Sequence, residues 1–113
     1  MTRIKSREVV ESIDPSILDD LSLPDRLAIG IDRLKRDRGA RAKELAEQLV
    51  VTEAYMSQVL RGMRDVKLST LDRMAREWNV TIEELLTVTD ADLPRIAALL
   101  TRRKKTKTGN LPD

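Results

Sequence analysis

The chain has 113 residues, of which 41% are apolar and 35% charged, enough for one compact domain with tails. It contains no Cys and no His, which excludes disulfides, thiol catalysis, zinc-finger ligand sets and the usual imidazole general base. The N-terminus lacks a signal-peptide pattern and no apolar run approaches membrane length, so we expect a cytoplasmic protein.

The net charge of +2 is unevenly distributed along the chain. Residues 1–23 carry a net charge of −2, residues 24–90 are neutral, and residues 91–113 carry +4. A basic end of this kind suits a polyanionic partner.

The N-terminal part contains two helix-start signals. The apolar residues before Asp14 follow neither the period of a strand nor that of a helix. Asp14-Pro15 then predicts a short helix ending near Asp20. Ser22, followed by Pro24 and an acid, predicts the start of a longer helix that Gly39 ends. Gly30 inside this helix costs up to about 1 kcal/mol relative to Ala unless close packing requires it.

The central part reads as two short helices joined by a tight turn. The first is expected over 42–49, and Thr52 caps the second, which Gly62 ends. The apolar residues of this pair are Leu45, Ala46, Leu49, Val51, Met56 and Val59. Such a pair buries its inner faces and leaves the outer face of the second helix exposed, so that this helix can enter the major groove of DNA.

Three further helices are predicted. Ser69 is expected to cap a helix with a full apolar stripe at Leu71, Met74, Ala75 and Trp78. Thr81 and Glu84 form a capping-box pattern for a short helix. A last helix is expected from about Asp92 to Arg102, with Leu93, Ile96, Ala97 and Leu100 on one side.

These signals predict an all-α fold with about five helices between 22 and 88 and an extra helical segment at each end. The expected divisions are an N-terminal extension over 1–21, a DNA-binding domain over 22–88, a C-terminal helix over 89–102 and a basic disordered tail over 103–113.

Residues 31–86 resemble the Cro/C1-type helix-turn-helix family, also described as phage-repressor-like or XRE-like. The segments that carry the resemblance are 44–46, 51–52, 56–59, 61–62, 68–71 and 78–80. The resemblance implies a five-helix DNA-binding domain, usually dimeric, that reads palindromic operators with its third helix. Val50 stands where the family usually has Gly, and a left-handed Val there would cost roughly 1–2 kcal/mol. Arg41 and Ala42 replace the Ser and Gln that often start the second helix.

The candidate base contacts lie on the third helix of this domain: Glu53, Ala54, Tyr55, Ser57 and Gln58. The Gln58 amide can pair with adenine N6 and N7. Glu53 either stabilises the helix dipole or accepts from cytosine N4. Tyr55 either meets a phosphate or thymine methyl or packs half-buried, Ser57 can reach a phosphate or a base edge, and Ala54 offers only a methyl group.

The candidate phosphate contacts are Arg41, Lys43, Thr52, Arg61, Arg64 and Lys67. Surface cations are usually just solvated, but a cluster beside a groove-entering helix favours a phosphate clamp. With two aromatics and no Phe, base stacking on single strands is disfavoured. We see no nucleophile–base pair and no phosphate-cradling loop, so we expect no catalytic residues, no metal and no cofactor.

Two functions fit these patterns. The first is a sequence-specific regulator of transcription, a repressor that binds a palindromic operator as a homodimer. The second is an antitoxin that masks a toxin and represses its own gene. The candidate dimer contacts are Val9, Val10, Ile13, Leu93, Ile96 and Leu100. The basic cluster Arg102, Arg103, Lys104, Lys105 and Lys107 is either a solubilising helix end or an arm on DNA.

Overall fold

The computed structural model describes residues 16–110, and their side chains from 16 to 102. The regular secondary structure of this part of the chain is helical, and it contains no strand. The predictions for Asp14-Pro15 and for the apolar residues Val9, Val10 and Ile13 lie outside the described residues. The helices fall into two compact units, one formed by Ser22–Thr87 and the other by the two terminal segments.

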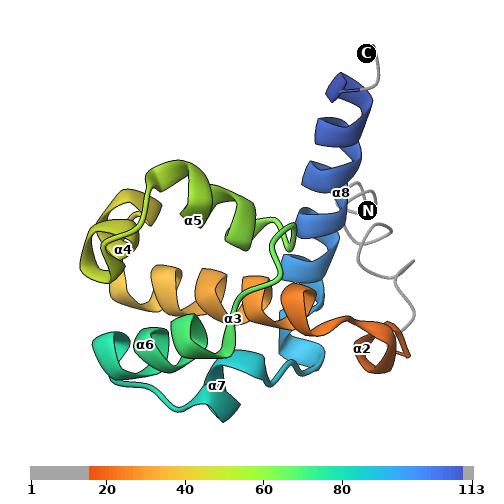
Figure 1. Cartoon of the computed structure of the whole chain (residues 1–113). Coiled ribbons are helices and arrows are strands. Elements are labelled where there is room, and N and C mark those ends of the chain that lie inside the picture. The colour runs from red at the N-terminus through yellow and green to blue at the C-terminus, as the bar shows by residue number, and fades with distance from the viewer. Residues whose placement is uncertain (1–15, 111–113) are drawn as a thin grey trace. The chain divides into compact units, whose positions relative to one another are not determined.

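The unit Ser22–Thr87 contains five helices, which confirms the predicted fold. They are α3 (Leu23–Arg38), α4 (Ala42–Leu49), α5 (Glu53–Leu60), α6 (Leu68–Trp78) and α7 (Ile82–Leu86). The long helix α3 runs through the middle, with α5 packed on one side and α7 on the other (Figure 1). Helix α4 packs against both α5 and α6.

One apolar core holds these five helices together. Its fully buried members come from every helix and include Ile31, Leu45, Leu49, Met56, Met74, Trp78 and Leu85. Since each helix contributes only one apolar stripe, none of the five can bury its apolar face alone. Because the core buries the inner face of α5, the opposite face of this helix is turned outward.

Most helix boundaries follow the predicted caps. The Ser22 and Thr52 hydroxyl oxygens accept from the Asp25 and Tyr55 amides at 3.2 and 3.0 Å. Thr81 and Glu84 exchange the two hydrogen bonds of a capping box. Gly39 ends α3 in the left-handed conformation.

The prediction that Ser69 caps α6 is wrong. The helix begins at Leu68 with Lys67 as its N-cap, and no side chain bonds the first amides. The Lys67 carbonyl instead accepts from the amides of Thr70 and Leu71 at 3.0 and 2.9 Å, which closes the first turn one residue earlier than a helix capped by Ser69.

Three arginines bind the carbonyl ends of other helices in this unit. Arg33 donates to the Glu84 and Thr87 carbonyls at 2.8 and 3.2 Å, and Arg38 donates to the Trp78 carbonyl at 2.6 Å. Arg73 donates to the Leu49 carbonyl. The last carbonyls of a helix have no partner within it, so these guanidinium groups satisfy the C-terminal ends of α7, α6 and α4.

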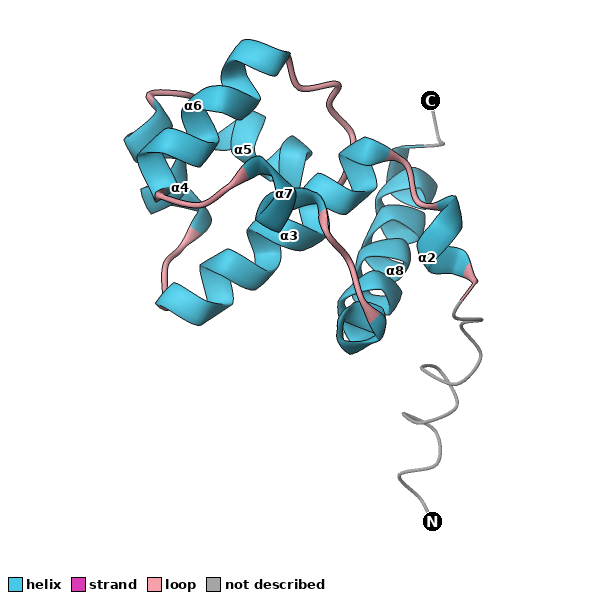
Figure 2. Cartoon of the chain, turned by 90° about the horizontal axis from the view of Figure 1, so that it is seen from below, coloured by secondary structure: helices cyan, strands magenta, loops and turns pink. Residues whose placement is uncertain are grey.

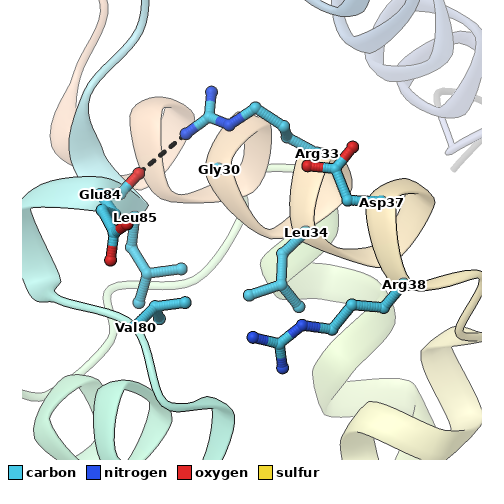
Figure 3. Close-up of a pocket in the computed structure, with 8 residues that line it drawn as sticks. All are labelled: Gly30, Arg33, Leu34, Asp37, Arg38, Val80, Glu84 and Leu85. Atoms are coloured by element: carbon cyan, nitrogen blue, oxygen red, sulfur yellow. Dashed lines mark hydrogen bonds between the residues drawn. The ribbon is translucent and has the colours of Figure 1, made fainter.

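Gly30 lies where α3 and α7 approach most closely. A Cβ atom at Gly30 would stand 1.9 Å from the Leu85 carbonyl oxygen, so only glycine fits (Figure 3). Beside this contact is a cleft of about 160 Å³ lined by Arg33, Asp37, Arg38 and Glu84 among others. Ligand pockets usually measure about 300–1,000 Å³, so we assign this cleft to helix packing.

The second unit contains α2 (Ile17–Asp20), the 3₁₀ turn η1 (Asp90–Asp92) and α8 (Leu93–Asn110); Figure 2 labels the two α-helices. Asp92 is buried, and its carboxylate accepts from the Thr89 amide at 3.0 Å and from Arg95 at 3.2 Å. These bonds fix the start of α8. The helix continues to Asn110, so its expected end at Arg102 is wrong. Lys and Arg are good helix formers, and the first Pro after the basic cluster is Pro112.

Candidate nucleic-acid interface

Helices α4 and α5 form the predicted pair, joined by the turn at Val50. Val50 has φ 58° and ψ 50°, the left-handed conformation, and its side chain is 83% exposed. The Val50 and Val51 amides bond the Glu47 and Ala46 carbonyls at 3.1 and 3.0 Å. The turn therefore has the left-handed backbone that usually ends a helix at Gly, although the residue is Val. The Val50 side chain is sterically strained in this conformation.

Helix α5 buries one face and exposes the other. Met56 and Val59 are fully buried against the core. Glu53, Ala54 and Gln58 are exposed. Because no side chain of the unit covers them, these three residues form the accessible part of the predicted base-reading set.

Tyr55 and Ser57, the other two predicted base contacts, are half-buried and already have partners. The Arg64 guanidinium carbon lies 4.8 Å from the centroid of the Tyr55 ring. Ser57 Oγ accepts a 2.9 Å hydrogen bond from Arg61. Tyr55 and Ser57 thus each contact an arginine that follows α5, and these pairs were not predicted from the sequence. For Ser57 and Arg61 the i,i+4 spacing is a signal that reveals the pair.

The predicted phosphate contacts lie around the two ends of this helix pair. Arg41 precedes α4, and its amide donates to Glu44 Oε1 at 2.7 Å; Lys43 is in the first turn. Thr52 accepts the α5 capping bond, and its hydroxyl proton remains able to donate to an anion. Arg61 ends α5, Arg64 lies in the loop that follows, and Lys67 is the N-cap of α6. All except the half-buried Arg61 are exposed.

Cations thus lie at the start of α4 and in the segment after α5, and the first turn of α5 carries one acid, Glu53. Lysine and arginine so placed can neutralise backbone phosphates on either side of a groove. Among the described residues no group of His, Cys, Asp or Glu is arranged to hold a metal ion. No helix within the same residues has the length and apolar character needed to cross a membrane.

A short helix pair with a buried inner seam and an exposed second helix defines a helix-turn-helix domain. The sequence profile of the Cro/C1-type HTH DNA-binding domain matches residues 31–91. The chain belongs to this family.

Two similar proteins support the assignment. One is the HTH-type transcriptional regulator DdrOP3 of Deinococcus deserti, 30% identical over 61 residues, which are 54% of this chain and 47% of that protein. The chain thus matches about half the length of this relative. A crystal structure of the hypothetical transcription factor NHTF from Neisseria has 29% identity and a TM-score of 0.55, covering 58% of this chain and 76% of the other.

Proposed function

We propose that the protein is a sequence-specific regulator of transcription that reads double-stranded DNA through α5. The observation that carries this proposal is the exposed face of α5, with Gln58 on it and exposed cations at the start of α4 and in the loop after α5. The family and the names of the two similar proteins support the same class of function.

In this proposal the base contacts come from α5 and the phosphate contacts from the residues around it. Gln58 is the strongest candidate for direct readout, because a Gln amide both donates and accepts at an adenine edge. Glu53 and Ala54 are exposed in the first turn of α5. Ser57 retains a hydroxyl proton that can reach a phosphate or a base edge while its oxygen accepts from Arg61.

The experiment selects bound duplexes from a random pool and then compares Gln58→Ala with wild type on the selected site. Loss of the Gln58 contact should cost about 1–3 kcal/mol and relax the preference at one base position. Gln48→Ala is the matched control, since Gln48 is an exposed glutamine on α4. Equal affinity of the wild type for selected and scrambled duplexes would contradict the proposal.

We further propose that the protein acts as a repressor and binds a palindromic operator as a homodimer. The exposed face of one eight-residue helix covers only a few base pairs, so specificity calls for two half-sites. Of the apolar residues predicted for the interface on α8, Ile96 is fully buried, whereas Leu93 and Leu100 are half-buried. Leu93 and Leu100 are therefore the better candidates for dimer contacts on α8.

Inverted half-sites spaced about 10–10.5 base pairs apart in the selected sequences would support the dimer. Sedimentation of the complex with one protein chain per site would contradict it. The antitoxin alternative gains no support from the fold or from the similar proteins, so a toxin partner is not proposed.

A further inference from the structure

The Arg64 guanidinium lies over the Tyr55 ring, and this contact joins the loop after α5 to the helix itself. The Arg64 guanidinium carbon lies 4.8 Å from the Tyr55 ring centroid, within cation–π range. The two residues are nine positions apart, and Gly62, in the left-handed conformation with φ 69°, reverses the chain between them. The contact is therefore a product of the loop fold.

Both sides of the pair are held in place by other bonds. The Tyr55 amide is fixed by the Thr52 hydroxyl at 3.0 Å, and its ring packs against the core. The Met63 amide, next to Arg64 in the chain, donates to the Gln58 carbonyl at 3.0 Å. An arginine side chain normally has many rotamers. Here the backbone next to Arg64 and the guanidinium group at the end of its side chain are both restrained.

A guanidinium group that stacks on a ring through its face keeps the N–H donors along its edge available. The five N–H donors of arginine lie in the guanidinium plane and match the oxygens of a phosphate in a bidentate fashion. Over residues 16–102, no hydrogen bond or ion pair engages Arg64. Tyr55 is itself half-buried, so its ring contributes more to holding Arg64 than to reaching a base.

We propose that Tyr55 is a positioning residue, and that the Arg64 guanidinium stacked on its ring binds one DNA backbone phosphate through its edge. A phosphate is favoured over a base because Arg64 belongs to the loop beyond α5, three positions before the exposed Lys67, and not to the exposed face that carries Gln58. The inference rests on the proposed function, and it replaces the expectation that Tyr55 reads a base.

The stack is tested first in the protein without DNA. The Arg64 δ-proton resonances should be shifted upfield by the Tyr55 ring, and Tyr55→Leu should abolish the shift while Tyr55→Phe keeps it. Tyr55 is the only tyrosine of the chain, so its ring signals are assigned without ambiguity. Unshifted Arg64 δ protons in the wild type would overturn the proposal at this stage.

The role of the stack is tested by affinity for the selected duplex and for a scrambled duplex over a range of salt concentrations. Tyr55→Leu should weaken binding to both duplexes about two- to fivefold, the effect of one exposed cation–π contact, whereas Tyr55→Phe should bind as wild type. Arg64→Lys keeps the charge and should leave the salt slope unchanged, yet lose affinity, because an ammonium has no planar fork. In an Arg64→Ala background, Tyr55→Leu should have no further effect.

Three outcomes would overturn the proposal. They are a Tyr55→Phe loss equal to that of Tyr55→Leu, a change of preference at one base pair in either Tyr55 variant, and additive losses in the double variant. Thermal melting of each variant checks that the fold persists, and the surface substitution Arg64→Lys does not touch the core. Failure of the proposed function can be told apart from failure of this inference. In the first case the wild type would bind selected and scrambled duplexes alike, while the stack and its salt-dependent phosphate contact would remain measurable.

Discussion

Arg61 and Ser57 lie one turn apart at the C-terminal end of α5, and Arg61 Nη2 donates a 2.9 Å hydrogen bond to Ser57 Oγ. This bond holds the guanidinium along the helix. Both residues are predicted DNA contacts. Their contributions to DNA affinity can be separated through the salt dependence of binding, because the two side chains differ in charge. Ser57 carries none, whereas Arg61 contributes one positive charge.

Arg61→Ala should flatten the dependence of log affinity on log salt by about 0.9, the value for one phosphate contact on duplex DNA. Ser57→Ala should leave that slope unchanged, because it removes no charge. Binding titrations between low and moderate salt measure both slopes. Arg76→Ala serves as the control, since Arg76 on α6 is an exposed arginine paired with Asp72 at 3.0 Å. An unchanged slope in Arg61→Ala would exclude Arg61 from the phosphate contacts.

Val50→Gly should stabilise the domain. Val50 is left-handed, which costs a side-chain-bearing residue about 1–2 kcal/mol, and its 83% exposed side chain contributes little packing. Glycine removes that strain but loses about 0.5–1 kcal/mol to the greater freedom of the unfolded chain. We therefore expect a net gain of up to about 1.5 kcal/mol in the free energy of unfolding, measured by urea unfolding.

The matched control for Val50 is Asn79→Gly. Asn79 has φ 56° and ψ 50° at the end of α6, almost the same conformation, but asparagine tolerates it well. The gain at Asn79 should therefore be smaller than at Val50. Equal or greater stabilisation at Asn79 would show that Val50 is not strained.

Gly30→Ala should destabilise the domain, although alanine is the better helix former by about 1 kcal/mol. The new Cβ would stand 1.9 Å from the Leu85 carbonyl oxygen, a backbone atom of α7 that cannot move alone. Overpacking of this kind typically costs about 1–3 kcal/mol. Urea unfolding measures the difference, and an increase in stability would contradict the close approach of α3 and α7.

The local parts of this fold were predictable from the sequence because their signals are local. A hydroxyl at Ser22, Thr52 or Thr81 bonds an amide three residues away, and a glycine at 39 ends a helix by its own backbone freedom. The same reasoning failed at Ser69, where the backbone of Lys67 closes the first turn without a side chain. Capping patterns indicate where a helix can start, and packing decides among the candidates.

Contacts between distant residues had no such signals. Arg33, Arg38 and Arg73 bind backbone carbonyls, which every residue carries, so no pattern in the sequence identifies the acceptors. The stacking of Arg64 on Tyr55 depends on the path of the loop between them. The sequence therefore offered candidate residues for the interface, which stay a prediction, whereas their pairing with one another required the three-dimensional structure.

The basic cluster at the end of α8 is the subject of the last prediction. Five of the six residues 102–107 are Lys or Arg, and the helix that carries them continues to Asn110. If this helical end lies along the DNA backbone, deletion of residues 102–113 should flatten the salt slope by roughly 2–4, since each phosphate contact contributes about 0.9. Specific and nonspecific sites should weaken alike, because phosphates carry no sequence information.

A second variant separates loss of charge from loss of the helix end. Replacement of Arg102, Arg103, Lys104, Lys105 and Lys107 by glutamine keeps good helix formers in place and removes the five charges. It should flatten the slope as much as the deletion does. If neither variant changes the slope, the basic cluster does not contact DNA. Its role is then to stabilise the C-terminal end of α8, where cations interact well with the helix dipole. The readout by α5 would then stand unaffected, because its test depends on the base preference at the selected site and not on the salt slope.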